Sequence, residues 1–79
     1  MCLLIVKEKG IQKPSWEHLN NGWNANSDGV GIAWTDGRGF VSFKKFLDYN
    51  DFKKFCKTAE FSGNEEKYSI MYHFRWATH

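Results

Sequence analysis

The stretch Ser69-Ile70-Met71-Tyr72-His73-Phe74-Arg75-Trp76-Ala77-Thr78-His79 organises the rest of the chain. Residues 70–74 have the apolar character of a buried strand, and Arg75, Thr78 and His79 follow where that strand should become a loop. A rigid strand positions such side chains while the loop admits a ligand. The guanidinium binds a carboxylate through two parallel hydrogen bonds, to which Thr and His add others. The pattern favours a small carboxylate site, although a solvated or ion-paired Arg would give the same local sequence.

The other end of the chain carries a candidate nucleophile. Cys2 precedes the apolar run Leu3-Leu4-Ile5-Val6, which predicts a short strand buried on both faces. Removal of Met1 would give Cys2 a free α-amine with a pKa of roughly 8, able to act as general base for the thiol beside it. If Met1 is retained, Cys2 has no free α-amine and cannot act as an N-terminal nucleophile.

Three features in this order carry a family resemblance. They are Cys2 on its apolar strand, the turn Asn24-Ala25-Asn26-Ser27-Asp28-Gly29-Val30-Gly31, and the final motif from His73 to His79. Together they resemble the class II glutamine amidotransferases of the N-terminal-nucleophile hydrolase superfamily, and above all the short amidotransferase-like proteins of phages and bacteria. The resemblance implies an α+β fold of which this chain holds the first part.

The resemblance also assigns roles to residues. It implies that Cys2 attacks the side-chain amide of glutamine, forms a thioester and releases ammonia. Arg75, Thr78 and His79 match the motif that holds the α-carboxylate of the substrate. Asn26, Asp28, Gly29 and Gly31 match the turn behind the nucleophile, where glycines allow a close approach of the nucleophile strand. An ordinary tight turn would have the same sequence.

The chain departs from the family at several points. Leu3 stands where the family usually has Gly, and Ala25 lies near a position that holds Arg in the synthase branch. After the position of His79 the family supplies an Asn-Gly pair for the oxyanion hole and an Asp that binds the substrate amine. Losing one oxyanion donor typically costs about 10²–10³ in rate. Residues 1–79 are therefore expected to be inactive by themselves.

Two functions follow as expectations. The first is glutamine amide hydrolysis by Cys2, with glutamine as substrate, no cofactor, and the missing groups supplied by further sequence. The second is an inactive, truncated member that binds a protein, for example a phage protein that inhibits a host protein. A glutaminase assay with a Cys2→Ser variant separates the two.

Periodicity and turn formers predict one α+β domain over residues 1–79, with a mostly antiparallel four-stranded sheet, one short helix and one long helix. The strands are expected at residues 2–7, 29–35, 39–44 and from about 67 onward, with a tight hairpin at Asp36-Gly37. A short helix should begin after Ser15 and stop at Asn20-Asn21-Gly22. The long helix, capped by Asp48 or Asn50, should bury a face formed by Phe52, Phe55, Cys56 and Ala59.

Two helices can cover one face of such a sheet. The other face should be apolar and either exposed or covered by a protein partner, a second copy of the chain or further sequence. We therefore expect a protein partner or a homodimer.

The composition of the chain excludes or disfavours several classes of protein. Of the 79 residues, 42% are hydrophobic and 18% aromatic, which excludes intrinsic disorder. The net charge of +2 without a basic stripe argues against nucleic acid. The apolar run after Met1 is too short for a signal peptide or a membrane span, so we expect a cytoplasmic protein (host cytoplasm if phage-encoded) with reduced thiols. Cys56 should be an inert core thiol, and the histidines show no metal-ligand spacing, so no metal is expected.

Overall fold

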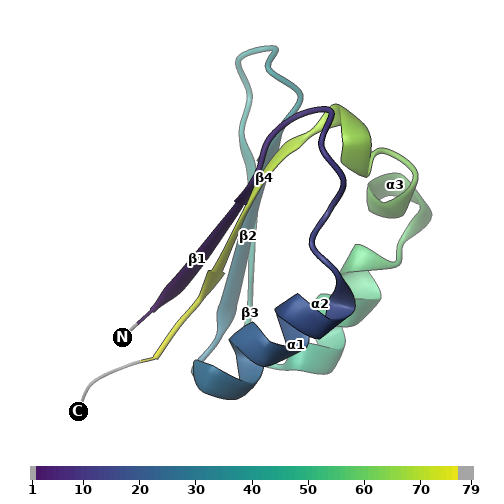
Figure 1. The fold of residues 1–79 in the computed structure, drawn as a ribbon. Coiled ribbons are helices and arrows are strands. Elements are labelled where there is room, and N and C mark those ends of the chain that lie inside the picture. The colour runs from purple at the N-terminus through teal and green to yellow at the C-terminus, as the bar shows by residue number, and fades with distance from the viewer. Residues whose placement is uncertain (1, 77–79) are drawn as a thin grey trace.

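The computed structural model describes residues 2–76, apart from the side chains of Ala59 and Glu60. Thr78 and His79 therefore lie outside the described residues, as does the side chain of Ala59. The elements run in the order β1 (Leu3–Lys7), α1 (Trp16–Ala25), β2 (Val30–Thr35), β3 (Ser42–Phe46), α2 (Tyr49–Cys56), α3 (Ala59–Ser62), a 3₁₀ turn (Glu65–Lys67) and β4 (Ser69–Phe74) (Figure 1). The predicted α+β class is confirmed.

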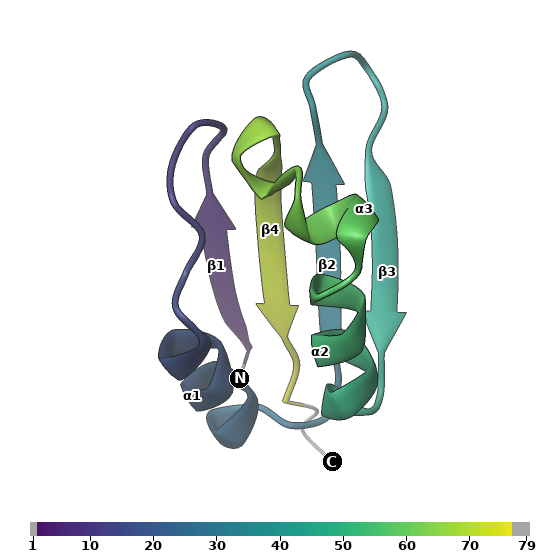
Figure 2. The ribbon, with the colours of Figure 1, turned by 90° about the vertical axis from the view of Figure 1, so that its right-hand side faces the viewer.

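The strands form one antiparallel sheet in the order β1-β4-β2-β3 (Figure 2). The last strand of the chain thus lies between the first and the second. It pairs Phe74 with Leu3 on one side and with Val30 on the other. The strand part of the organising stretch, Ser69–Phe74, is therefore one of the two central strands of the sheet.

All helices lie on one face of the sheet, which we call the inner face (Figure 1). Phe52 of α2 is fully buried there, with its ring centroid 6.3 Å from those of Tyr72 and Phe74. Cys56 is 5% exposed and joins the same core, so the predicted burial of these two helix residues is confirmed. The core consists of Leu19, Val30, Ile32, Phe52, Cys56, Phe61, Ile70, Tyr72 and Phe74.

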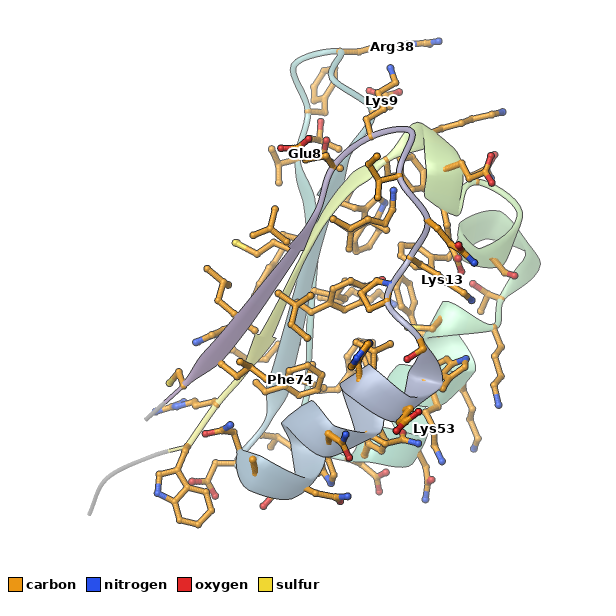
Figure 3. The ribbon with its side chains drawn as sticks, viewed as in Figure 1. Glu8, Lys9, Lys13, Arg38, Lys53 and Phe74 are labelled. Carbon is orange, nitrogen blue, oxygen red and sulfur yellow. The ribbon has the colours of Figure 1, made fainter. Side chains whose placement is uncertain are left out.

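The predicted lengths of the two main helices are wrong. α1 has ten residues and continues through Gly22, whereas α2 has eight and ends at Cys56. A Cβ on Gly22 would lie 2.9 Å from the ring of Phe74, so this glycine serves a close approach between α1 and β4 rather than a helix stop (Figure 3). α2 ends early because the N–H of Lys57 is shared between the carbonyls of Lys53 and Lys54, which tightens the last turn.

The hairpin between β2 and β3 is wider than predicted. Residues 36–41 connect the strands, and β3 begins at Ser42 instead of residue 39. The Thr35 hydroxyl donates to the carbonyl of Phe40 at 2.6 Å, and the N–H of Arg38 donates to Asp36 Oδ1 at 2.9 Å. These side-chain bonds support a longer loop than the two-residue turn suggested by Asp36-Gly37. Arg38 lies at its tip (Figure 3).

No helix in the part of the chain that the structure describes covers the opposite, outer face of the sheet (Figure 1). Leu4 and Val6 of β1 are 55% and 63% exposed, and Met71 of β4 is 42% exposed. Burial of β1 on both faces was therefore a wrong prediction, because only alternate residues of the strand face the helices. The prediction that this face is apolar and not buried by the helices of residues 2–76 is confirmed. Within residues 2–76, no helix has the length and apolar character needed to cross a membrane.

Candidate functional site

Strand pairing brings Cys2 and Arg75 to the same end of the sheet, where β1 begins and β4 stops. Leu3 pairs with Phe74, so Cys2 precedes and Arg75 follows a matched pair on neighbouring strands. Leu3 and Phe74 both point toward α1, since each lies within 3.2 Å of the position that a Cβ on Gly22 would take. The alternation of the strands, continued by one residue, directs Cys2 and Arg75 to the outer face. Both are exposed.

The turn from Asn26 to Gly29 is fastened to Arg75 by its backbone. The N–H of Asp28 donates to the Arg75 carbonyl at 2.8 Å, and the N–H of Arg75 donates to the Gly29 carbonyl at 2.9 Å. Gly29 has φ +144°, a conformation that side-chain-bearing residues rarely adopt. Asn26 caps α1 through its backbone and is 5% exposed, with its Oδ1 unbonded among the described residues. Two of the four predicted turn residues, Asp28 and Gly29, thus adjoin the predicted carboxylate ligand, whereas Asn26 is bonded to α1.

The fourth, Gly31, has a different neighbour from the one implied by the family resemblance. β4 separates Gly31 from the strand of Cys2. A Cβ on Gly31 would instead lie 3.3 Å from the ring of Phe43 on β3. The missing side chain leaves a hollow in the outer face, between the strand that carries His73 and the strand that carries Lys45.

This hollow, which we call the Gly31 pocket, has a volume of about 280 Å³. Its lining residues come from the turn, from β2 and β3, and from the end of β4. They are Asp28, Gly29, Val30, Gly31, Phe43, Lys45, Leu47, His73 and Arg75. The pocket combines two permanent cations, an imidazole and a carboxylate with apolar walls. Cys2 is not among the described residues that line it.

The two thiols differ in environment. Both are free, with Cys2 exposed and Cys56 buried. Burial, helped by the nearby Glu65 carboxylate and opposed by Lys13, raises the pKa of Cys56 to about 12. Cys56 is therefore an inert thiol at neutral pH, as predicted, and Cys2 is the accessible thiol.

Sequence reasoning found Arg75 but missed Lys45 and Phe43 as its companions in the pocket. The signal that could have identified them is the alternation of Ser42-Phe43-Lys44-Lys45-Phe46, which places Phe43 and Lys45 on the same face of β3. His73, two residues before Arg75 in β4, shares the outer face for the same reason. Among the described residues, no group of three or more His, Cys, Asp or Glu side chains is arranged to hold a metal ion.

An apolar row crosses the outer face beside the pocket. Val6 pairs with Met71, Met71 with Ala33, and Ala33 with Phe43, so these four side chains form one line across all four strands. Val6 and Phe43 are 63% and 60% exposed. A shallow apolar hollow of about 210 Å³ lies along part of this row. Large contiguous apolar patches on a protein surface are often interaction sites, which makes this row a candidate interaction surface.

Comparison of the chain with protein-family models, with curated proteins and with solved structures finds no match.

Proposed function

We propose that Cys2 and Arg75, at the end of the sheet where β1 begins and β4 stops, form part of a glutamine amide-hydrolysing site. Cys2 supplies the nucleophile and Arg75 binds the carboxylate of the substrate. The observation that carries this proposal is the strand pairing that sets Cys2 beside Arg75. Cys2 and Arg75 are far apart in sequence, yet each adjoins the end of a strand, and the terminal residues of those strands, Leu3 and Phe74, are paired. The resemblance to class II glutamine amidotransferases supports the same assignment from the sequence motifs.

The chemistry requires removal of Met1. The α-amine of Cys2 then takes the thiol proton, and the thiolate attacks the carbonyl carbon of the glutamine side-chain amide. The amide C–N bond breaks, ammonia leaves with the proton, and a thioester joins Cys2 to the glutamyl group. Water cleaves that thioester to give glutamate and the free thiol. Arg75 holds the α-carboxylate throughout, and an oxyanion hole is to be supplied by further sequence or by a partner.

A diazoketone analogue of glutamine tests the proposal without requiring turnover. Its carbon bonds to the thiolate of Cys2 as dinitrogen leaves, and intact mass followed by peptide mapping reports the labelled residue. Arg75→Ala should slow labelling by about 10- to 100-fold, because two charge-assisted hydrogen bonds to the carboxylate are lost. Arg38→Ala, which removes a guanidinium at the distant hairpin tip, is the matched control.

Iodoacetamide provides the second control, because it alkylates thiols but has no carboxylate for Arg75 to bind. The proposal requires equal iodoacetamide rates in the parent protein and in Arg75→Ala. Equal diazoketone rates in these two proteins would overturn it, as would a chain that keeps Met1 in its native source.

A second candidate function is protein binding through the apolar row on the outer face. The observation that favours it is the exposure of Val6, Met71 and Phe43 on a face that no helix of the described part of the chain covers. The partner is another protein or a second copy of this chain. Sedimentation and pull-down experiments on a Val6→Lys/Met71→Lys variant should show loss of the assembly, whereas Lys54→Glu on the helix side should keep it. A parent protein that is monomeric and captures no partner would contradict this function.

A further inference from the structure

The Gly31 pocket is a hollow between strands rather than a gap between loops. β2 forms its floor, since Gly31 pairs with His73 of β4 on one side and with Lys45 of β3 on the other. Two strand spacings separate β3 from β4, which is about 10 Å. The floor residue has no side chain, so groups from the flanking strands face each other across an open space. Phe43 and Leu47 supply apolar walls.

The charges of the pocket are divided between its two sides. Arg75 extends from the end of β4, and Lys45 extends from β3. Asp28 is the one carboxylate among the described lining residues, and His73 adds a ring nitrogen that can donate. Two permanent cations on opposite sides, with apolar surface between them, match a ligand that carries an anion at each end and methylene groups in the middle.

Lys45 has an alternative explanation, for which the neighbouring residue Lys44 provides a control. Edge strands such as β3 often carry lysines that block pairing with another chain. Lys44 faces the helix side, where its Nζ lies 5.2 Å from the centroid of the Phe55 ring. Lys45 faces the outer side and lines the pocket. The two lysines thus have equal charge, adjacent positions and opposite faces, which makes Lys44 a matched control.

The size of the pocket limits the ligand. Its volume of about 280 Å³ lies just below the range for drug-sized small-molecule sites, about 300–1,000 Å³. A nucleotide or a large cofactor exceeds this space. A single inorganic anion would occupy only one of the two cationic sides.

We propose that the Gly31 pocket binds a small dicarboxylate, with one carboxylate on Arg75, the other on Lys45, and the aliphatic chain against Phe43 and Leu47. This goes beyond the proposed hydrolysis, because neither Cys2 nor any bond cleavage is involved. Lys45 is a specificity-determining residue that selects a second anionic group.

The test is a binding titration of the full chain, monitored by nuclear magnetic resonance. Glutarate serves as the dicarboxylate and butyrate as the matched monocarboxylate. Glutarate should bind about three- to ten-fold more tightly than butyrate at low ionic strength, because Lys45 is exposed and its charge is partly screened. The amide signals of Gly29 and Gly31 should shift during the titration. Lys45→Ala should remove the preference, and Lys44→Ala should keep it.

Two further variants and a phosphate titration complete the test. Arg75→Ala should weaken both ligands, and Cys2→Ser should leave both unchanged, which keeps this proposal separate from the fate of the hydrolysis. Equal binding of glutarate and butyrate would overturn the proposal, and so would shifts that map elsewhere or the absence of binding at millimolar concentration. Phosphate binding as tight as that of glutarate would show a single-anion site instead. The dispersion of the spectrum verifies that each variant is folded.

Discussion

The backbone N–H of Arg75 donates to the carbonyl of Gly29 across 2.9 Å, which ties the end of the central strand to the turn before β2. The bond joins the two most informative motifs of the sequence. It extends the pairing of β2 and β4 by one residue and holds Arg75 at the end of the sheet where Cys2 also lies. The position of the candidate carboxylate ligand is thus fixed by backbone hydrogen bonds.

Gly29→Ala should destabilise the protein by about 1–3 kcal/mol, because φ +144° is strained for any residue with a Cβ. Steric contact contributes little, since the new atom would lie 3.4 Å from the Phe46 carbonyl oxygen. Urea denaturation measures the loss. Gly31→Ala should cost under about 1 kcal/mol, because its new contact is with the exposed, movable ring of Phe43. A larger loss at Gly31 than at Gly29 would show that backbone strain is not the controlling factor.

Cys2 should react with iodoacetamide in the native protein at neutral pH, while Cys56 should not. Cys2 is exposed, whereas Cys56 is buried with its pKa raised to about 12. Mass spectrometry should therefore find one modified thiol before denaturation and two after it. Modification of native Cys56 at the rate of Cys2 would mean that the core opens readily around α2.

The fold class was predictable because the local signals agree with the tertiary structure. Ser15 and Asp48 are polar residues placed before apolar helix faces, and both accept the expected cap hydrogen bonds. Gly22 shows where such reasoning fails. The local sequence Asn20-Asn21-Gly22 indicates a helix stop, yet the contact with Phe74 uses the glycine within the helix. That contact joins parts of the chain that are distant in sequence, so the residues around Gly22 give no sign of it.

The candidate site was predictable only in part for a similar reason. Arg75 was identified from its place at the end of an apolar strand, and its role stays a prediction. Lys45 was not identified, because its meeting with Arg75 depends on the strand order β1-β4-β2-β3. Strand order is set by long-range packing, so a single sequence gives no direct measure of which strands are neighbours.

The protein should lose stability as the pH rises from about 9 toward 12. Burial raises the pKa of Cys56 from 9.0 to about 12, and that of Tyr49 from 10.0 to about 12. Burial raises the pKa of Tyr72 as well. The unfolded chain therefore releases protons in this range while the folded chain retains them, which favours unfolding. Urea midpoints across the range measure the slope, and Cys56→Ala should reduce it. A slope unchanged by that substitution would contradict the assignment to Cys56.

Lys7→Ala should cost about 1–3 kcal/mol, because Lys7 is 3% exposed and its ammonium donates to the carbonyls of Tyr68 at 2.8 Å and Glu8 at 3.0 Å. The substitution removes both hydrogen bonds and the buried aliphatic stem. Lys9→Ala is the control, since Lys9 is exposed and its ammonium donates only a long hydrogen bond, of 3.3 Å, to the backbone carbonyl of Asp36. Its effect on urea unfolding should stay within about 0.5 kcal/mol. Equal losses for the two lysines would show that burial of Lys7 contributes nothing.

Truncation of two neighbouring residues of β4 should destabilise the protein to very different extents. Ile70 faces the helices and is 1% exposed, so Ile70→Ala should cost about 2–5 kcal/mol through lost burial and the cavity left behind. Met71 faces outward in the apolar row and is 42% exposed, so Met71→Ala should cost under about 1 kcal/mol. Urea denaturation of dilute protein makes the comparison. A Met71 loss as large as that of Ile70 would mean that the outer face is covered in solution, and its dependence on protein concentration would show whether a second copy covers it.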